Sequence, residues 1–176
     1  MSKPATYSAA LPIAYVVLRL LIVLNLLMGA AILSLLIATI VAEEWTFRAL
    51  GITAASGIPS MIMGLRAIAA LGLVAIPLNH MILARLVAMV LTVRAGDAFT
   101  AANARRLQAI AWVLLALQLL SIAIAAIGKM VSTAANPVNL DAGFSINGWL
   151  AVLLTFILAR VFEEGARIRD DLEKMI

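Results

Sequence analysis

The chain has 176 residues, of which 65% are hydrophobic and only 12% are charged, and its mean hydropathy is +1.11. A soluble domain is nearer half apolar and a quarter charged, so this composition excludes a water-soluble fold and indicates a membrane protein. The net charge of +4 lies at the ends of apolar runs, which does not resemble a nucleic-acid-binding face. The lack of cysteine excludes disulfides, and a single histidine argues against a zinc site made by the protein alone.

Four apolar runs predict four transmembrane helices, at approximately residues 20–41, 67–93, 107–128 and 146–162. The first run is longer than the apolar region of a cleavable signal peptide, roughly 7–15 residues, and is interpreted as a retained signal anchor. The runs do not alternate as strands do, and an open sheet cannot satisfy its backbone in lipid. The sequence therefore predicts one all-α membrane domain over residues 1–176, built as a four-helix bundle.

Lysine and arginine are distributed unevenly between the segments that these spans separate. With both termini in the cytosol, the inner segments carry ten of the 13 lysines and arginines. The outer loops then carry Arg48, Arg66 and Lys129. Because cytosolic segments of membrane proteins are enriched in these residues, the sequence predicts an N-in, C-in orientation.

The polar segment 96–107, between the second and third spans, predicts a tight helical hairpin. We expect Gly96 to end the second helix with a positive φ, Thr100 to cap the third helix, and Asn103 to occupy its N3 position. The arginines around this turn either anchor the hairpin at lipid headgroups or contact a protein partner. These arginines are Arg94, Arg105 and Arg106.

The segment after the fourth span, residues 163–176, predicts a short amphipathic helix in the cytosol. Opposite charges recur at helical spacing, and each such pair stabilises a helix by roughly 0.2–0.5 kcal/mol. Apolar and small residues follow the same spacing, at Val161, Gly165, Ile168, Leu172 and Met175. This stripe either packs on the protein's own hairpin or the membrane, or docks a cytosolic protein. The candidate partner or headgroup contacts here are Arg167, Arg169, Ile168 and Leu172.

Five polar residues inside the spans are candidates for an intramembrane cluster: Asn25, Asn79, His80, Gln118 and Thr155. Counting from the span ends places Gln118 and Thr155 near mid-depth and His80 slightly to the cytosolic side. The favoured interpretation is hydrogen bonding between helices, because no carboxylate lies deep in a span to partner His80. The alternative is a ligand or proton site centred on His80.

Two segments carry a family resemblance. The hinge has the pattern G-x-x-F-T-x-x-N-x-x-R-L, with Gly96, Phe99, Thr100, Asn103, Arg106 and Leu107. The tail has V-F-x-x-G followed by an aspartate, with Val161, Phe162, Gly165 and Asp171. Together they resemble a bacterial four-span membrane family known as domain of unknown function 2975. Ile168 stands where the family pattern has leucine, and Ala101-Ala102 stands where family hinges often have Pro-Glu.

The resemblance implies a protein of the bacterial inner membrane and also a partner, because such proteins are often encoded beside a small helix-turn-helix repressor of the Cro/CI type. We therefore expect a non-enzymatic regulatory or scaffold protein that binds this regulator, and not nucleic acid directly. The alternatives are a small-solute or ion transport component, acting as a homo-oligomer, and a structural subunit of a larger membrane complex. The sequence has no phosphate loop, metal-binding helix or serine nucleophile motif, so we expect neither catalysis nor a cofactor.

Overall fold

The computed structural model describes residues 10–42, 58–132 and 142–174, and most of these residues lie in long helices. The helices are α1 (Ala10–Val41), α3 (Ile58–Arg94), α4 (Ala101–Val131) and α5 (Ile146–Glu173). All four are long and apolar enough to cross a membrane. The described residues contain no strand, and the prediction of an all-α protein with four spans is confirmed.

The helices extend beyond the apolar runs that predicted them. α1, α3 and α4 begin at Ala10, Ile58 and Ala101, each at least six residues before the predicted span. A helix continues past its apolar stretch because each further turn satisfies backbone groups that a loop would leave open. α3 also passes Pro77 without a break. Residues 43–57, most of the predicted first outer loop, lie outside the described residues.

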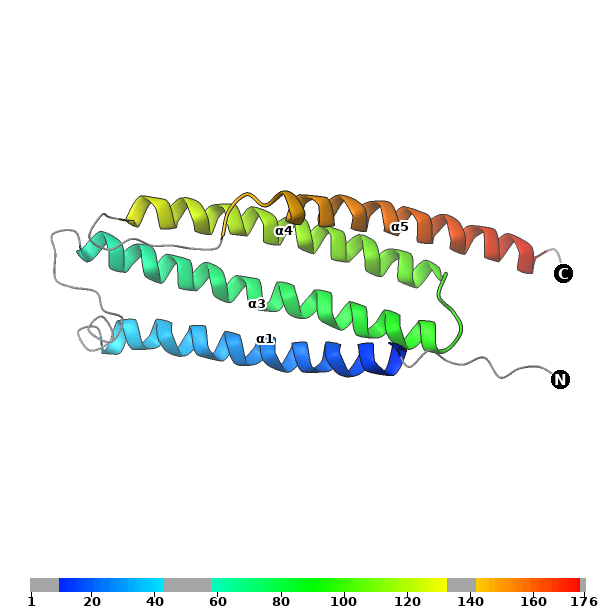
Figure 1. Cartoon of the computed structure of the whole chain (residues 1–176), viewed down its shortest axis with the longest axis horizontal. Coiled ribbons are helices and arrows are strands. Elements are labelled where there is room, and N and C mark those ends of the chain that lie inside the picture. Colours follow the sequence, from blue (N-terminus) through cyan, green and yellow to red (C-terminus); the bar gives the residue numbers. More distant parts are fainter. Residues whose placement is uncertain (1–9, 43–57, 133–141, 175–176) are drawn as a thin grey trace.

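The helices pack as an open row and not as a closed bundle. Contacts join α1 to α3, α3 to α4, and α4 to α5, and no other pair of the described helices is in contact. Figure 1 shows this order, with α3 between α1 and the α4–α5 pair. Because no helix is surrounded by the others, most apolar side chains of α1 and α5 remain exposed, as lipid contact requires.

α5 is displaced along α4 toward the turn at residues 95–100. Its residue Gly148 lies against the side chain of Gln118, near the middle of α4. At its other end, α5 passes the beginning of α4 and projects beyond the turn (Figure 1). We call residues 163–174 the α5 extension. The start of α1, the turn and the α5 extension therefore lie at one end of the row, which we call the hinge end.

Candidate functional site

The turn between α3 and α4 is built by two helix caps. Gly96 has a φ of 91°, and its N–H donates to the carbonyl of Val93 at 3.0 Å. The N–H of Asp97 donates to the carbonyl of Thr92 at 3.0 Å, which completes a Schellman motif. On the other side, Thr100 is the N-cap of α4, and its side chain accepts from the N–H of Asn103 at 3.2 Å. The structure thus places Gly96 and Thr100 in the cap positions expected from the sequence.

Asn103 is the fully buried polar centre of this turn, with an exposed fraction of 0%. Its Nδ2 donates to the hydroxyl of Thr92 at 2.8 Å and to the carbonyl of Ala98 at 2.9 Å. Its Oδ1 accepts from Nη1 of Arg106 at 2.7 Å. One amide thereby joins the end of α3, the turn and the first turn of α4. The sequence suggested only the N3 position for Asn103, and Thr92 was missed as its partner.

The turn also docks onto α5. The rings of Phe99 and Phe162 lie with centroids 4.9 Å apart. A Cβ at Gly165 would come within 2.8 Å of Cδ1 of Phe99, so the missing side chain makes room for the ring. Arg169 forms an ion pair with Asp97 at 2.8 Å. Phe99 and Gly165 are 66 residues apart in the sequence. The turn and the tail therefore form one unit at the hinge end, although they are distant along the chain.

The predicted apolar stripe of the tail does not form a single packed face. Gly165 faces Phe99, whereas Val161, Ile168 and Leu172 are 54%, 54% and 55% exposed. Met175 lies outside the described residues. The stripe therefore packs on the protein's own hairpin only at Gly165, and the other three residues form an exposed surface, the apolar face of α5.

Charged side chains along the α5 extension pair mostly with one another. Arg160 contacts Glu163 at 2.7 Å, Arg167 contacts Glu164 at 2.6 Å, and Lys174 contacts Asp171 at 3.8 Å. These pairs are solvent-exposed and contribute little to stability, but they fix the positions of the charges. Arg169 differs from them, since it reaches across to the turn.

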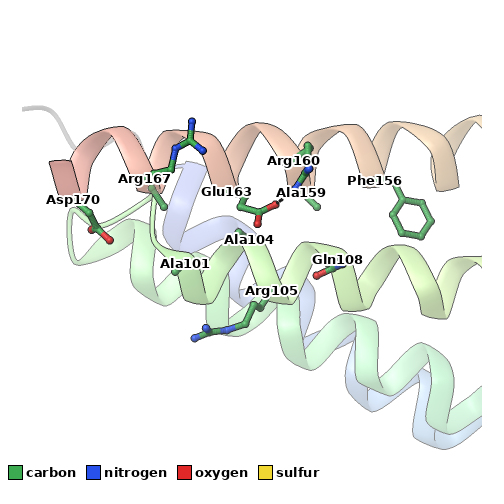
Figure 2. Close-up of a pocket in the computed structure, with 11 residues that line it drawn as sticks. Ala101, Ala104, Arg105, Gln108, Phe156, Ala159, Arg160, Glu163, Arg167 and Asp170 are labelled. Atoms are coloured by element: carbon green, nitrogen blue, oxygen red, sulfur yellow. Dashed lines mark hydrogen bonds and ion pairs between the residues drawn. The ribbon is translucent and has the colours of Figure 1, made fainter. Parts of the chain in front are cut away.

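A groove of about 490 Å³ separates the first half of α4 from the second half of α5. Small side chains open it, because Ala101 and Ala104 of α4 face Ala159 and Ala166 of α5. Figure 2 shows its remaining lining, with Phe156 at one end and Asp170 at the other. The other lining residues are Arg105, Gln108, Arg160, Glu163 and Arg167.

The arginines expected around the hinge are distributed over different surfaces. Arg105 is exposed and lines the groove, whereas Arg106 is half-buried and holds Asn103. Arg94 is exposed in the last turn of α3, where a cation favours the helix dipole. The arginines and the apolar side chains at the hinge end can bind a ligand or partner through ion pairing and apolar contact. Asp97 and Asp170 are not among the residues predicted from the sequence. Asp97 pairs with Arg169 and Asp170 lines the groove, and both positions depend on the packing of the turn, α4 and α5.

The structure does not bring the five intramembrane polar residues together, and within the described residues no hydrogen bond joins any two of them. Asn25 donates from Nδ2 to the carbonyl of Ile76 in α3 at 3.0 Å, and Thr155 donates to a carbonyl of its own helix. In the described part of the chain, Asn79 makes no side-chain hydrogen bond, and Nδ1 of His80 is buried without a partner. Hydrogen bonding between helices therefore applies to Asn25 alone among these four.

Gln118 supports the chain where it enters α5. Its Nε2 and the hydroxyl of Ser121 each lie 3.4 Å from the carbonyl oxygen of Gly143, and the N–H of Gly143 donates to Ser121 at 3.0 Å. Non-helical backbone beside an apolar span needs such partners from the protein. The displacement of α5 explains the difference from the predicted cluster, because it sets Gln118 opposite Gly148 and not opposite Thr155.

The row of four apolar helices defines this chain as a multi-pass α-helical membrane protein. A family model matches residues 49–176, and the chain belongs to that family, which is described as "Protein of unknown function (DUF2975)". The match includes all of α3, α4, the turn and α5, and so confirms the resemblance carried by the hinge and tail. No curated protein and no solved structure matched the chain.

Proposed function

We propose that this protein is a non-enzymatic scaffold of the bacterial inner membrane whose hinge end binds a small cytosolic helix-turn-helix regulator of the Cro/CI type. The observation that carries the proposal is the apolar face of α5, where Val161, Ile168 and Leu172 are each more than half exposed. Exposed apolar residues at helical spacing are the usual anchors when a helix packs into the groove of a partner. Ile168 and Leu172 belong to the α5 extension, beyond the apolar part of α5.

The way the α5 extension is held supports this role. Phe99 packs on Phe162 beside Gly165, and Asp97 pairs with Arg169, so the turn holds the extension along one edge of its apolar face. A surface that is already ordered loses less conformational entropy when a partner binds. The family context adds the kind of partner, since a regulator encoded beside the gene would meet this surface in the cytosol.

The proposal requires the hinge end to face the cytosol, and most of the described cations lie there. A chain without cysteine allows this orientation to be measured with single substitutions. We expect Lys129→Cys to react with a membrane-impermeant maleimide in cells whose outer membrane alone is permeable, and Asp97→Cys to react only after the inner membrane is opened. The positive-inside rule is the physical reason. The opposite labelling pattern would contradict the orientation.

Binding is tested with the protein in nanodiscs and a purified regulator of the Cro/CI type, the kind of protein often encoded beside genes of this family. We expect Ile168→Ser together with Leu172→Ser to weaken binding by about tenfold or more, because two apolar anchors lose their burial. The dissociation constant is measured by biolayer interferometry.

The matched control is Met130→Ser together with Phe144→Ser, which removes two exposed apolar side chains from regions remote from the hinge end. This pair should leave the dissociation constant unchanged. Equal affinity of the wild type and the Ile168/Leu172 variant, or no binding by the wild type, would refute the proposal.

A further inference from the structure

The groove between α4 and α5 changes from apolar to charged along its length. On α5 its lining runs from Phe156 through Ala159 to Glu163, and ends at Asp170 near the turn (Figure 2). Phe156 stacks edge-on against Trp112 of α4, with ring centroids 5.3 Å apart. The groove is open to the outside of the row and is not enclosed. It therefore follows the same order as a phospholipid in the leaflet on the hinge side, from acyl chain to headgroup.

Two charged residues that line the groove have side chains without an ionic or hydrogen-bonding partner in the described part of the chain. They are Arg105 on α4 and Asp170 on α5. The other charged residues in the lining are engaged, since Arg160 pairs with Glu163, and Arg167 pairs with a glutamate of its own helix. The groove thus offers one cation and one anion on opposite walls.

We propose that this groove binds the headgroup of a zwitterionic aminophospholipid. The phosphate lies at Arg105, whose guanidinium donates to phosphate oxygens, and the primary ammonium lies toward Asp170, whose carboxylate accepts from its N–H groups. The glycerol lies toward Ala104, and the acyl chains continue along the groove past Ala159 to Phe156. A volume of about 490 Å³ is within the range of small-molecule sites. This inference does not depend on the proposed regulator, because the groove and the apolar face of α5 are different surfaces.

Charge complementarity selects this lipid class over the others. An anionic headgroup such as phosphatidylglycerol satisfies Arg105 but places no cation beside Asp170. A choline headgroup carries a quaternary ammonium that has no N–H to donate to the carboxylate. Each of these lipids lacks one charge-assisted hydrogen bond that phosphatidylethanolamine makes.

The first measurement uses the wild-type protein, so that it depends on no variant. The full chain is delipidated in detergent, incubated with equimolar phosphatidylethanolamine, phosphatidylglycerol and phosphatidylcholine, and examined by native mass spectrometry. We expect phosphatidylethanolamine to be retained about tenfold better than either competitor, as one charge-assisted hydrogen bond provides. Equal retention of phosphatidylglycerol, or no retained lipid, would overturn the proposal. If a protein helix fills the groove instead of a lipid, no lipid is retained.

The second measurement assigns the two charges. Arg105→Gln and Asp170→Asn should each reduce retention of phosphatidylethanolamine about tenfold, and Asp170→Asn should leave retention of phosphatidylglycerol unchanged. The matched controls are Arg94→Gln and Asp171→Asn, which alter exposed charges that do not line the groove. Circular dichroism confirms that each variant keeps its helices. Wild-type retention in either groove variant would show that the lipid binds elsewhere.

Discussion

Replacing Asn103 with leucine will destabilise the protein by about 3 kcal/mol, a larger effect than we expect from any other single polar substitution in the chain. Leucine has a similar volume but cannot donate or accept hydrogen bonds. The carbonyl of Ala98 and the guanidinium of Arg106 would each lose a buried partner, and the hydroxyl of Thr92 would lose its donor. Leaving buried polar groups unpaired is costly because their desolvation is no longer compensated. Denaturation in mixed micelles, followed by circular dichroism, measures the free energy of unfolding.

Asn79→Leu is the matched control, since it makes the same chemical change in the neighbouring helix. The Asn79 side chain makes no hydrogen bond in the described part of the chain, so we expect its replacement to change the free energy of unfolding by no more than about 0.5 kcal/mol. If both variants have the same free energy of unfolding, the hydrogen bonds of Asn103 do not stabilise the turn.

Replacing Gly165 with leucine will release the α5 extension from the turn. A Cβ alone would lie 2.8 Å from Cδ1 of Phe99, and the rest of the side chain would occupy the place of the ring. Overpacking of this kind costs about 1–3 kcal/mol, which should lower the equilibrium constant for docking by about tenfold or more. Docking is measured in the otherwise cysteine-free chain by crosslinking Asp97→Cys to Arg169→Cys with a short bismaleimide. The exposed ion pair removed by these labels contributes little to docking.

Gly72→Leu is the control, because a Cβ at Gly72 meets no atom closer than 3.8 Å and lies in α3, far from the crosslink. It should leave the crosslinking rate unchanged. Phe99→Val, added to Gly165→Leu, removes most of the ring and should restore part of the lost crosslinking. Crosslinking of Gly165→Leu at the wild-type rate would show that Phe99 and Gly165 do not hold the hinge and tail together.

Local signals in the sequence were sufficient for the turn but not for its contacts. Gly96 and Thr100 act on backbone groups within a few residues, so their cap positions follow from residue type alone. The pairing of Asn103 with Thr92 depends on how α3 and α4 lie against each other, and no periodicity within either helix encodes it. The spacing of Gly165 places it in the apolar stripe of the tail. Its contact with Phe99 depends on how the turn and α5 pack, which the spacing does not encode.

The predicted polar cluster shows where the depth argument failed. Counting residues from the ends of each apolar run assumes that all spans cross the membrane in register. α5 instead begins beside the middle of α4, so Gln118 meets Gly143 and Gly148 at the start of that helix. Hydropathy does not predict the displacement. An apolar run indicates the length of a span, but not the position of that span relative to its neighbour along the membrane normal.

Composition, helix length and cap chemistry are local properties of the chain, so they were sufficient to predict a four-span, all-α membrane protein with a tight capped turn and a helical tail. The packing of the helices revealed three further features: the open row, the displacement of α5 toward the hinge end, and the docking of the turn on the tail through Phe99 and Gly165. It also decided which arginines face the groove. These features depend on the fit of side chains distant in sequence, and in lipid, where any apolar face is acceptable, hydropathy alone cannot choose between helix arrangements.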